Sequence, residues 1–322
     1  MTNGLFKAIQ AADERIKLYG VQTTPLETAG IFSDETGTEF LLKGEHLQLT
    51  GSFKMRGAMN KVLCLTEKQK QQGIITASSG NHGMATARAA KLGGTEATIY
   101  LPETVSPLKL ANIKRLGATP VLVPGNCVDA ERAAHQAAQA EGRYYISPYG
   151  DMDVIAGQGT IGLELTYQLD DFDAVYACVG GGGLISGIGS YLQTARPDCE
   201  IIGCWPEKAA AMYHCLERGE IWDVPETDTL SDGSAGGVEV GTPTFPICQQ
   251  VISRKVLVTE EEIKSAMRRV AEHERYIIEG AAAVAVAAAL KTAHDYKGAR
   301  IAVILCGRNI SLSTFQSVIN EE

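Results

Sequence analysis

A lysine at position 54 stands among small and apolar residues in the segment Gly51-Ser52-Phe53-Lys54-Met55-Arg56-Gly57, where a helical pattern begins. An amine that loses its water on burial is more easily neutral, and a neutral amine forms Schiff bases with carbonyl groups. Most lysines beside a glycine extend into water, so Lys54 alone does not identify a catalytic group. The case for chemistry here depends on three further motifs.

The first of these motifs is a run of four glycines after a buried strand pattern at residues 174–179. The glycines and the first residue of the helical pattern behind them are Gly180, Gly181, Gly182, Gly183 and Leu184. Backbone N–H groups without side chains can converge on an anion, and a helix N-terminus adds its positive dipole end. A tight turn without a ligand is the alternative, but four glycines cost more conformational entropy than such a turn requires. The run predicts a phosphate-binding loop.

A dinucleotide site is the competing interpretation, because Gly157-Gln158-Gly159-Thr160-Ile161-Gly162 fits the pattern Gly-x-Gly-x-x-Gly. Residues 151–156 before it make a poor strand, and the segment continues into a helical pattern at 163–169. We interpret these glycines as helix-packing residues. A Gly-x-x-x-x-Gly-Lys-Ser/Thr motif is also absent, so the sequence favours neither a nicotinamide dinucleotide nor ATP.

The second motif is the turn Ser78-Ser79-Gly80-Asn81-His82-Gly83, which also follows a strand pattern and opens a helix. Its hydroxyls, amide and N–H groups could bind a carboxylate or the hydroxyl of an aromatic ring. A helix N-cap alone would need only one of these groups. A lone histidine in a turn is more often a structural hydrogen-bonding residue than a general base.

The third motif is Cys306, which ends the apolar strand pattern at 301–305 just before Gly307. A buried thiol is usually a small hydrophobic group. At a strand end it could instead meet a pyridine nitrogen as an uncharged partner, and the ring would then be a weaker electron sink than beside a carboxylate. Together with the lysine, the turn and the glycine run, it predicts a site for pyridoxal 5'-phosphate.

The elements that must position these motifs are short β-rich runs alternating with longer helical patterns, as in an α/β protein with parallel-rich, twisted sheets flanked by helices. The predicted strands are residues 73–77, 97–101, 120–123, 174–179, 201–204 and 301–305. The predicted helices are residues 84–92, 107–116, 130–140, 260–273 and 281–294. Ligands collect past the carboxyl ends of parallel strands, where several of the motifs lie.

Boundaries near residues 50 and 150 suggest two lobes. We expect a large cofactor-binding domain from residues 1–49 and 150–322, and a small inserted domain from residues 50–149. The glycine-rich segment 231–237 would either approach the substrate or be a flexible loop.

Composition excludes several other classes of protein. The chain has 322 residues, 45% of them hydrophobic, enough to bury a sizeable core. Its formal charge of −9 disfavours nucleic acid and acidic membrane surfaces as partners. The longest apolar run, residues 281–290, is too short to span a bilayer. The eight cysteines form no Cys-x-x-Cys pair, and the histidines lack neighbours at ligand spacing, so we expect reduced thiols in a cytoplasmic protein without a metal site.

With Lys54, the 78–83 turn, the glycine run and Cys306 in this order, nearly the whole chain resembles the threonine and serine dehydratases and serine racemase. These are fold type II pyridoxal-phosphate enzymes with a two-lobed, tryptophan-synthase-β-like fold. The resemblance implies that Lys54 binds the cofactor aldehyde beside Phe53, and that the glycines and Leu184 hold the phosphate. It also implies roles for Asn81 at the ring hydroxyl and Cys306 at the pyridine nitrogen.

The resemblance further implies that the substrate carboxylate lies on Ser78, Asn81 and His82. Glu279, in Glu279-Gly280-Ala281-Ala282, corresponds to a cofactor-side position where many relatives read Glu-Pro-Ser/Thr-Gly or -Ala. Arg308 stands where glycine or alanine is common. The cation site of some relatives would begin at Glu207, but Tyr213 replaces its later acidic position, so no bound metal is expected.

The implied activity is a dehydratase, or ammonia-lyase, that removes the β-hydroxyl of a β-hydroxy amino acid and releases a 2-keto acid and ammonia. Lys54 would take the α-proton. Racemisation is an alternative, with Ser79 returning a proton from the opposite face. The substrate could also be a specialised one, such as 3-hydroxyaspartate or phenylserine, or the protein could be a cofactor-binding carrier or sensor without turnover. A homodimer is the default assembly for a soluble oligomer.

Overall fold

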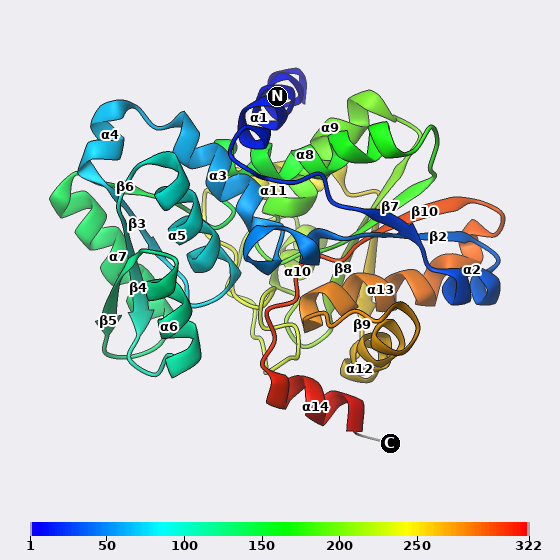
Figure 1. Cartoon of the computed structure of the whole chain (residues 1–322). Coiled ribbons are helices and arrows are strands. Elements are labelled where there is room, and N and C mark those ends of the chain that lie inside the picture. Colours follow the sequence, from blue (N-terminus) through cyan, green and yellow to red (C-terminus); the bar gives the residue numbers. More distant parts are fainter. Residues whose placement is uncertain (1, 321–322) are drawn as a thin grey trace.

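The computed structural model describes residues 2–320, and within them the strands form two sheets (Figure 1). The six-stranded sheet has the order β1 (Leu26–Thr28), β2 (Glu39–Lys43), β10 (Arg300–Ile304), β7 (Ala174–Cys178), β8 (Glu200–Pro206) and β9 (Arg254–Val258). The four-stranded sheet has the order β5 (Thr119–Val123), β4 (Ala97–Pro102), β3 (Ile74–Ala77) and β6 (Tyr144–Tyr145). Every pair is parallel except β1 with β2, which confirms the predicted parallel-rich α/β class.

Helices connect these strands. The α-helices are α1 (Thr2–Lys17), α2 (Gly30–Thr36), α3 (Lys54–Cys64), α4 (Glu67–Gln72), α5 (Asn81–Gly93), α6 (Pro107–Arg115), α7 (Cys127–Glu141), α8 (Met152–Gln168), α9 (Gly183–Ala195), α10 (Ala211–Arg218), α11 (Thr244–Val251), α12 (Glu260–Arg269), α13 (Gly280–Thr292) and α14 (Leu312–Asn320). The short helical turns are η1 (Glu45–Leu47), η2 (Leu49–Gly51), η3 (Val270–Glu274) and η4 (Ala293–Tyr296).

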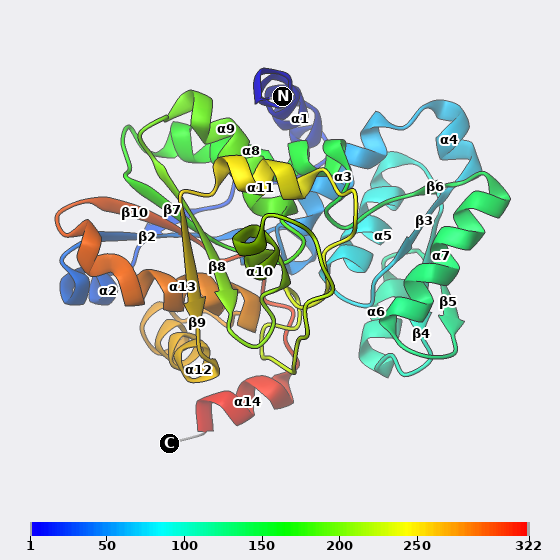
Figure 2. The same ribbon diagram turned by 180° about the vertical axis from the view of Figure 1, so that it is seen from behind.

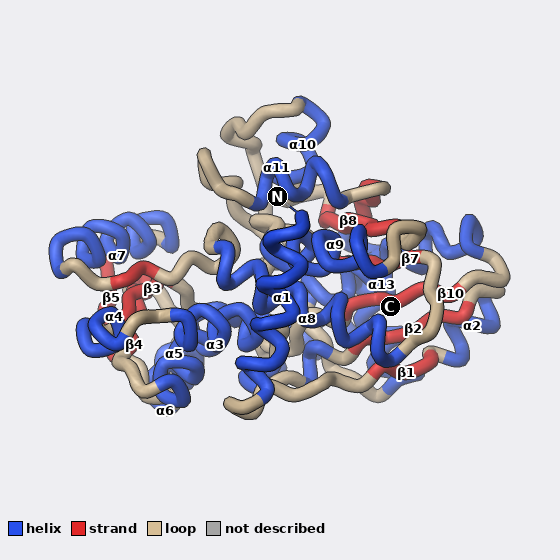
Figure 3. Tube along the Cα trace, turned by 90° about the horizontal axis from the view of Figure 1, so that it is seen from above, coloured by secondary structure: helices blue, strands red, loops and turns tan. Residues whose placement is uncertain are grey.

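The two sheets lie side by side, with α1, α3 and α8 between them (Figure 3). In Figures 1 and 2, α8, α9 and α11 cover one side of the six-stranded sheet, and α12 and α13 cover the other. Because the four-stranded sheet draws all its strands from residues 74–145, we propose that residues 50–149 form the small domain and that the rest forms the large one.

The Gly-x-Gly-x-x-Gly match lies inside helix α8, as the helix-packing interpretation predicted. A Cβ at Gly157 would lie 2.6 Å from the Cα of Gly57 on α3, and one at Gly159 would lie 2.9 Å from the carbonyl oxygen of Gly187 on α9. These glycines therefore let α8 approach both neighbouring helices closely, and they do not form a phosphate loop.

The predicted strands are all present, whereas β1, β2, β6 and β9 were not predicted. The helix predicted at 260–273 ends as an α-helix at Arg269 and continues as the π-helical turn η3. Helix α13 is buried along almost its whole length, so its apolar run serves the core. Within residues 2–320, no helix has both the length and the apolar character needed to cross a membrane.

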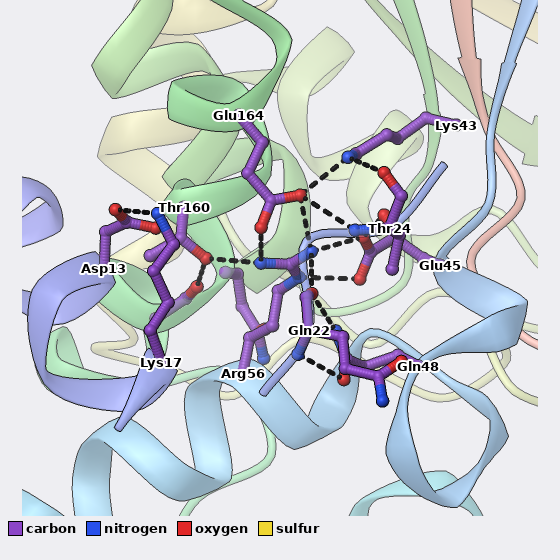
Figure 4. A network of polar contacts seen from close by, with 12 residues as sticks. Asp13, Lys17, Gln22, Thr24, Lys43, Glu45, Gln48, Arg56, Thr160 and Glu164 are labelled. Carbon is purple, nitrogen blue, oxygen red and sulfur yellow. Dashed lines mark hydrogen bonds and ion pairs between the residues drawn. The ribbon is translucent and has the colours of Figure 1, made fainter. Parts of the chain in front are cut away.

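A buried network of charges joins α3 to β2, η1 and α8 (Figure 4). Arg56, two residues after Lys54, makes paired hydrogen bonds of 2.7 to 2.9 Å with the carboxylates of Glu45 and Glu164. Lys43 donates to Glu164 at 2.6 Å. Burial disfavours the charge on Arg56, but the two carboxylates outweigh it and raise the pKa of Arg56 above its usual range. The network fixes the start of the helix that carries Lys54.

Candidate functional site

A pocket at the carboxyl end of β7 brings most of the predicted site residues together. It is lined by Phe53, Lys54, Asn81, Tyr149, Cys178, Val179, Gly180, Gly181, Gly182, Gly183, Leu184, Gly233, Ser234, Glu279, Ala281 and Cys306. Ser78, Ser79 and His82 lie in the adjoining turn and are not among these lining residues. A second hollow, bordered by α7 and β6, contains none of the predicted site residues.

Lys54 is the first residue of α3 and borders the pocket. Its Nζ donates a hydrogen bond of 2.8 Å to the carbonyl oxygen of Pro148. Burial lowers the pKa of Lys54 to about 8, although Cys306 and Glu279 act in the opposite direction. A larger fraction of this amine is therefore neutral near pH 7 than of an ordinary lysine.

The start of α3 is attached to the strand end that carries Cys306. The N–H of Phe53 donates to the carbonyl oxygen of Cys306 at 3.0 Å, and Ser52 forms an antiparallel bridge with Gly307. The N–H of Arg308 in turn donates to the carbonyl oxygen of Gly51 at 3.0 Å. These contacts hold the amine of Lys54 and the thiol of Cys306 in one pocket, although 252 positions separate the two residues in the chain.

The glycine run forms a turn between β7 and α9 with little free space on its side-chain face. A Cβ at Gly180 would lie 2.8 Å from the carbonyl oxygen of Ser234, and Gly182 has a φ of 85° that disfavours other residues. Among residues 2–320, no acceptor takes the N–H groups of Gly180, Gly181 and Gly182. Free N–H donors before the N-terminus of a helix are suited to a phosphate group.

Asn81 and Glu279 belong to a chain of hydrogen bonds at the pocket wall. Asn81 Nδ2 donates to Glu279 Oε1 at 2.7 Å, and the N–H of Asn309 donates to Glu279 Oε2 at 2.9 Å. Asn309 Nδ2 donates to Asn81 Oδ1 at 2.6 Å. Burial raises the pKa of Glu279 to about 7, although the bonds from Asn309 and Asn81 stabilise its charge. The second N–H of Asn81 remains available for a ligand oxygen.

His82 is buried, and its ring points to protein groups. Its Nε2 lies 3.0 Å from Thr76 Oγ1 and 3.1 Å from the carbonyl oxygen of Ile146, so this nitrogen carries a proton and donates to the carbonyl. Burial, followed by the charge of Lys54, lowers the pKa of His82 to about 3. The side chain is therefore a neutral structural group.

The neighbouring serines differ in their hydrogen bonds. Ser78 Oγ accepts from the N–H of Gly80 at 3.3 Å. Ser79 is half-buried, and its hydroxyl has no hydrogen-bond partner within the described part of the chain.

Two buried thiols border the pocket. Burial, and then the nearby Glu279, raise the pKa of Cys306 well above its usual range, and burial raises that of Cys178 to about 12. Both thiols are therefore neutral near pH 7. Residues 2–320 contain no group of histidine, cysteine and acidic side chains arranged to hold a metal ion.

Two pocket residues, Tyr149 and Cys178, were missed by the sequence analysis, as was Asn309, which contacts the pocket wall through Asn81 and Glu279. Cys178 could have been found, because it lies two residues before the glycine run, near the end of a predicted strand. Tyr149 follows β6, a strand of two residues that leaves almost no pattern. Gly233 and Ser234 show that the 231–237 segment does reach the pocket.

The donor set fits pyridoxal 5'-phosphate. The glycine N–H groups suit its phosphate, the shielded amine of Lys54 its aldehyde, the amide of Asn81 its ring hydroxyl, and the neutral thiol of Cys306 its pyridine nitrogen. Each of these groups lines the same pocket. The chemistry expected from the sequence is thus compatible with the arrangement in space.

Comparisons with known proteins point the same way. Residues 4–307 match the family described as "pyridoxal-phosphate dependent enzyme". The L-threonine ammonia-lyase of Thermotoga maritima is 39% identical over 302 residues, or 94% of this chain and 75% of that protein. Serine racemase of Dictyostelium discoideum is 36% identical over 324 residues, or 99% of both chains.

Among solved structures, the processed form of threonine deaminase isoform 2 from Solanum lycopersicum superposes with a TM-score of 0.94 at 35% identity. The match covers 99% of this chain and 93% of that one. The fold, the pocket and these matches agree in one conclusion: the chain belongs to the family of pyridoxal-phosphate-dependent enzymes.

Proposed function

We propose that this protein is an ammonia-lyase that converts a threonine- or serine-like β-hydroxy amino acid to a 2-keto acid and ammonia. The observation that carries the proposal is the amine of Lys54, which borders the pocket beside the glycine run with a pKa lowered to about 8. The relative from Thermotoga maritima, itself named an L-threonine ammonia-lyase, supports the choice of reaction.

Residues of both lobes would hold the cofactor. Lys54 would bind its aldehyde with Phe53 beside it, Gly180 to Leu184 its phosphate, Asn81 its ring hydroxyl and Cys306 its pyridine nitrogen. Glu279 would orient Asn81 through their 2.7 Å hydrogen bond. When bound, pyridoxal phosphate withdraws electrons from the α-carbon of the amino acid and so makes its α-proton easier to remove.

Lys54 is positioned to act as the base. With the amino acid bound in the pocket, the neutral amine of Lys54 would accept the α-proton as the Cα–H bond breaks. The carbonyl oxygen of Pro148 can orient this amine, because it already accepts a hydrogen bond from Nζ at 2.8 Å. The α-proton and the β-hydroxyl would together be lost as one molecule of water, which leaves an enamine. Addition of water to the imine form of this product would break its C–N bond and give the keto acid and ammonia.

The turn at 78–83 would bind the substrate carboxylate. Its donors would be the hydroxyl of Ser78 and the backbone N–H groups of Asn81 and His82, because one N–H of the Asn81 amide is bonded to Glu279 and the ring of His82 is bonded to Ile146 and Thr76. The N-terminus of α5, which begins at Asn81, adds a positive dipole end for the same anion.

The thiol of Cys306 bears on the outcome of the reaction. A neutral thiol does not protonate the pyridine nitrogen, so negative charge at the α-carbon is less stabilised than it would be beside a carboxylate. Rapid loss of the β-hydroxyl is then favoured over transamination.

Racemisation is a second candidate, because the hydroxyl of Ser79 has no partner among residues 2–320. The resemblance to serine racemase implies a position for Ser79 on the face opposite Lys54, from which its hydroxyl would return a proton to the α-carbon. The relative from Dictyostelium discoideum is named a serine racemase. We also propose that the protein is a homodimer, the commonest assembly of soluble oligomers. The free thiols of its eight cysteines support a cytoplasmic location.

The test is an assay of ammonia and keto acid with purified, cofactor-loaded protein. The panel contains L-threonine, L-serine, 3-hydroxyaspartate and phenylserine, with chiral analysis of the remaining amino acid and Lys54→Ala as the control. We expect ammonia from at least one substrate and none from the variant. A D-isomer without ammonia would establish racemisation, and bound cofactor without either product would establish a carrier or sensor.

A further inference from the structure

Tyr149 is a pocket residue that none of the sequence motifs includes, and it contacts two separate parts of the large domain. It follows β6, in a turn held by Ser147, whose Oγ accepts from the N–H groups of Tyr149 at 3.5 Å and Gly150 at 2.9 Å. The turn also contains Pro148, whose carbonyl oxygen accepts from Lys54. Its position is therefore well defined relative to the base.

The ring of Tyr149 lies against the glycine run. A Cβ at Gly181 would overlap the ring carbons Cγ, Cδ1 and Cε1, and one at Gly183 would lie 3.0 Å from the Cα of Tyr149. The absence of side chains at these glycines thus has a second role besides exposing N–H groups. It allows an aromatic ring to pack directly on the backbone of the loop and to limit its movement.

The hydroxyl of Tyr149 reaches the long connection between α10 and α11. The N–H of Glu239 donates to it at 3.2 Å, and the two residues are 90 positions apart. A Cβ at Gly150 would lie 3.3 Å from Thr242 Oγ1 and 3.7 Å from Glu239 Oε2, so this whole turn packs on residues 239–242. Figure 2 shows the connection passing between α10 and the helices of the four-stranded sheet.

The same connection is anchored at a second point, on the pocket side. Ser234 is buried and packs on Gly180, and Ser231 and Ser234 share a hydrogen bond of 2.5 Å. Between Ser234 and Glu239 lie the exposed residues Ala235, Gly236 and Gly237 and the buried Val238. The N–H of Gly236 donates to Glu226 Oε2 at 2.7 Å, and Val238 packs in the core. A short glycine-rich segment held at several points has few positions open to it, and the tyrosine hydroxyl is the attachment at Glu239.

We propose that Tyr149 is a positioning residue with two separable effects. Its ring forms a wall of the phosphate loop and so sets the affinity for the cofactor. Its hydroxyl holds residues 235–241 beside the pocket and so sets the affinity for the amino acid. The second effect rests on the function proposed above, whereas the first requires only cofactor binding.

The experiment compares Tyr149→Phe and Tyr149→Ala with the wild type, and uses Tyr167→Phe as a matched control because Tyr167 is 73% exposed on α8. Three quantities are measured: amide hydrogen exchange of residues 235–241 in the cofactor-loaded protein, the dissociation constant of pyridoxal phosphate, and kcat and KM for the substrate found in the panel.

For Tyr149→Phe we expect exchange at Glu239 to accelerate and KM to rise by about 3- to 10-fold, the size that the loss of one hydrogen bond produces. The kcat and the cofactor dissociation constant should stay within about twofold, because the ring remains. For Tyr149→Ala we expect the cofactor dissociation constant to rise more than about tenfold. The Tyr167→Phe control should match the wild type.

Unchanged exchange at Glu239 in Tyr149→Phe would overturn the role of the hydroxyl, as would acceleration spread evenly over the whole chain. Unchanged cofactor affinity in Tyr149→Ala would overturn the role of the ring. If no amino acid is turned over by the wild type, the proposed function fails, but hydrogen exchange and cofactor binding still decide the role of Tyr149.

Discussion

Replacing Arg56 by methionine should destabilise the protein far more than replacing a surface arginine. The guanidinium is 1% exposed and makes four hydrogen bonds of 2.7 to 2.9 Å to the carboxylates of Glu45 and Glu164. Methionine fills similar space but leaves two buried carboxylates with only Lys43 as a cation. Removing one partner from a buried ion pair costs about 3–5 kcal/mol, so we expect the free energy of unfolding to fall by that amount.

The measurement is equilibrium unfolding in urea, followed by circular dichroism and by tryptophan fluorescence. Arg300→Met is the matched control, because Arg300 pairs with Glu39 at 2.8 Å with 35% of its side chain exposed. A pair of that exposure contributes about 0–1 kcal/mol. Adding Glu45→Gln to Arg56→Met removes the surplus charge and leaves the neutral pair of Lys43 and Glu164. This double variant should recover about half of the lost stability.

The loss of free energy of unfolding in Arg56→Met should also become smaller as pH falls. In the wild type, burial opposes the charge of Glu164, but Arg56 outweighs it and lowers the pKa of Glu164, so its contribution is present above the unfolded pKa and is lost as pH falls. In Arg56→Met the two buried carboxylates share Lys43 as their only cation. Their burial then favours the protonated form, so the pair takes up a proton above the unfolded pKa of about 4.3. That variant is penalised at neutral pH and less so in acid. The difference between the two proteins should therefore shrink as pH falls towards about 4. A loss equal to that of Arg300→Met, constant with pH, would refute this reasoning.

Three further predictions concern the pocket. The rate of ammonia release should rise as pH passes about 8. Below the lowered pKa of Lys54 the amine is mostly protonated and cannot accept the α-proton. If kcat, plotted against pH, shows no rising limb in this region, Lys54 is not the base. Glu279→Gln removes a negative charge that raises the pKa of Lys54. The rising limb of the pH profile of kcat should therefore move to lower pH. A limb that stays in place or moves to higher pH would show that Glu279 does not act on the amine. Gly181→Ala places a Cβ inside the ring of Tyr149 and should weaken cofactor binding more than about tenfold in an absorbance titration. Gly30→Ala, where an added Cβ meets nothing within 4 Å, serves as its control, and equal affinities in the two variants would contradict the close packing of the glycine loop.

Several parts of the molecule follow from local sequence. The glycine run begins two residues after the last residue of the buried strand β7, and its last glycine is the first residue of α9. Its character as a strand-to-helix turn is therefore contained in neighbouring residues. The same holds for the 78–83 turn between β3 and α5. Continuous apolar runs predicted the central parallel strands, because strands buried on both faces carry apolar residues at every position. Short elements were missed because they contain too few residues to show a pattern. Strand β6 has two residues and exists only through its pairing with β3.

The sequence by itself determined the fold class, the cofactor chemistry and most of the residues that line the pocket, because each motif carries its chemistry within a few neighbouring residues. The tertiary structure alone decided which of these groups interact. Arg56 and Glu164 are 108 positions apart, Tyr149 and Glu239 are 90 apart, and Asn81 and Asn309 are 228 apart. It also decided that the ring of His82 faces Ile146 and that burial brings the pKa of Lys54 to about 8. Such properties depend on distance and on exclusion of water, and both arise only when distant segments pack against one another.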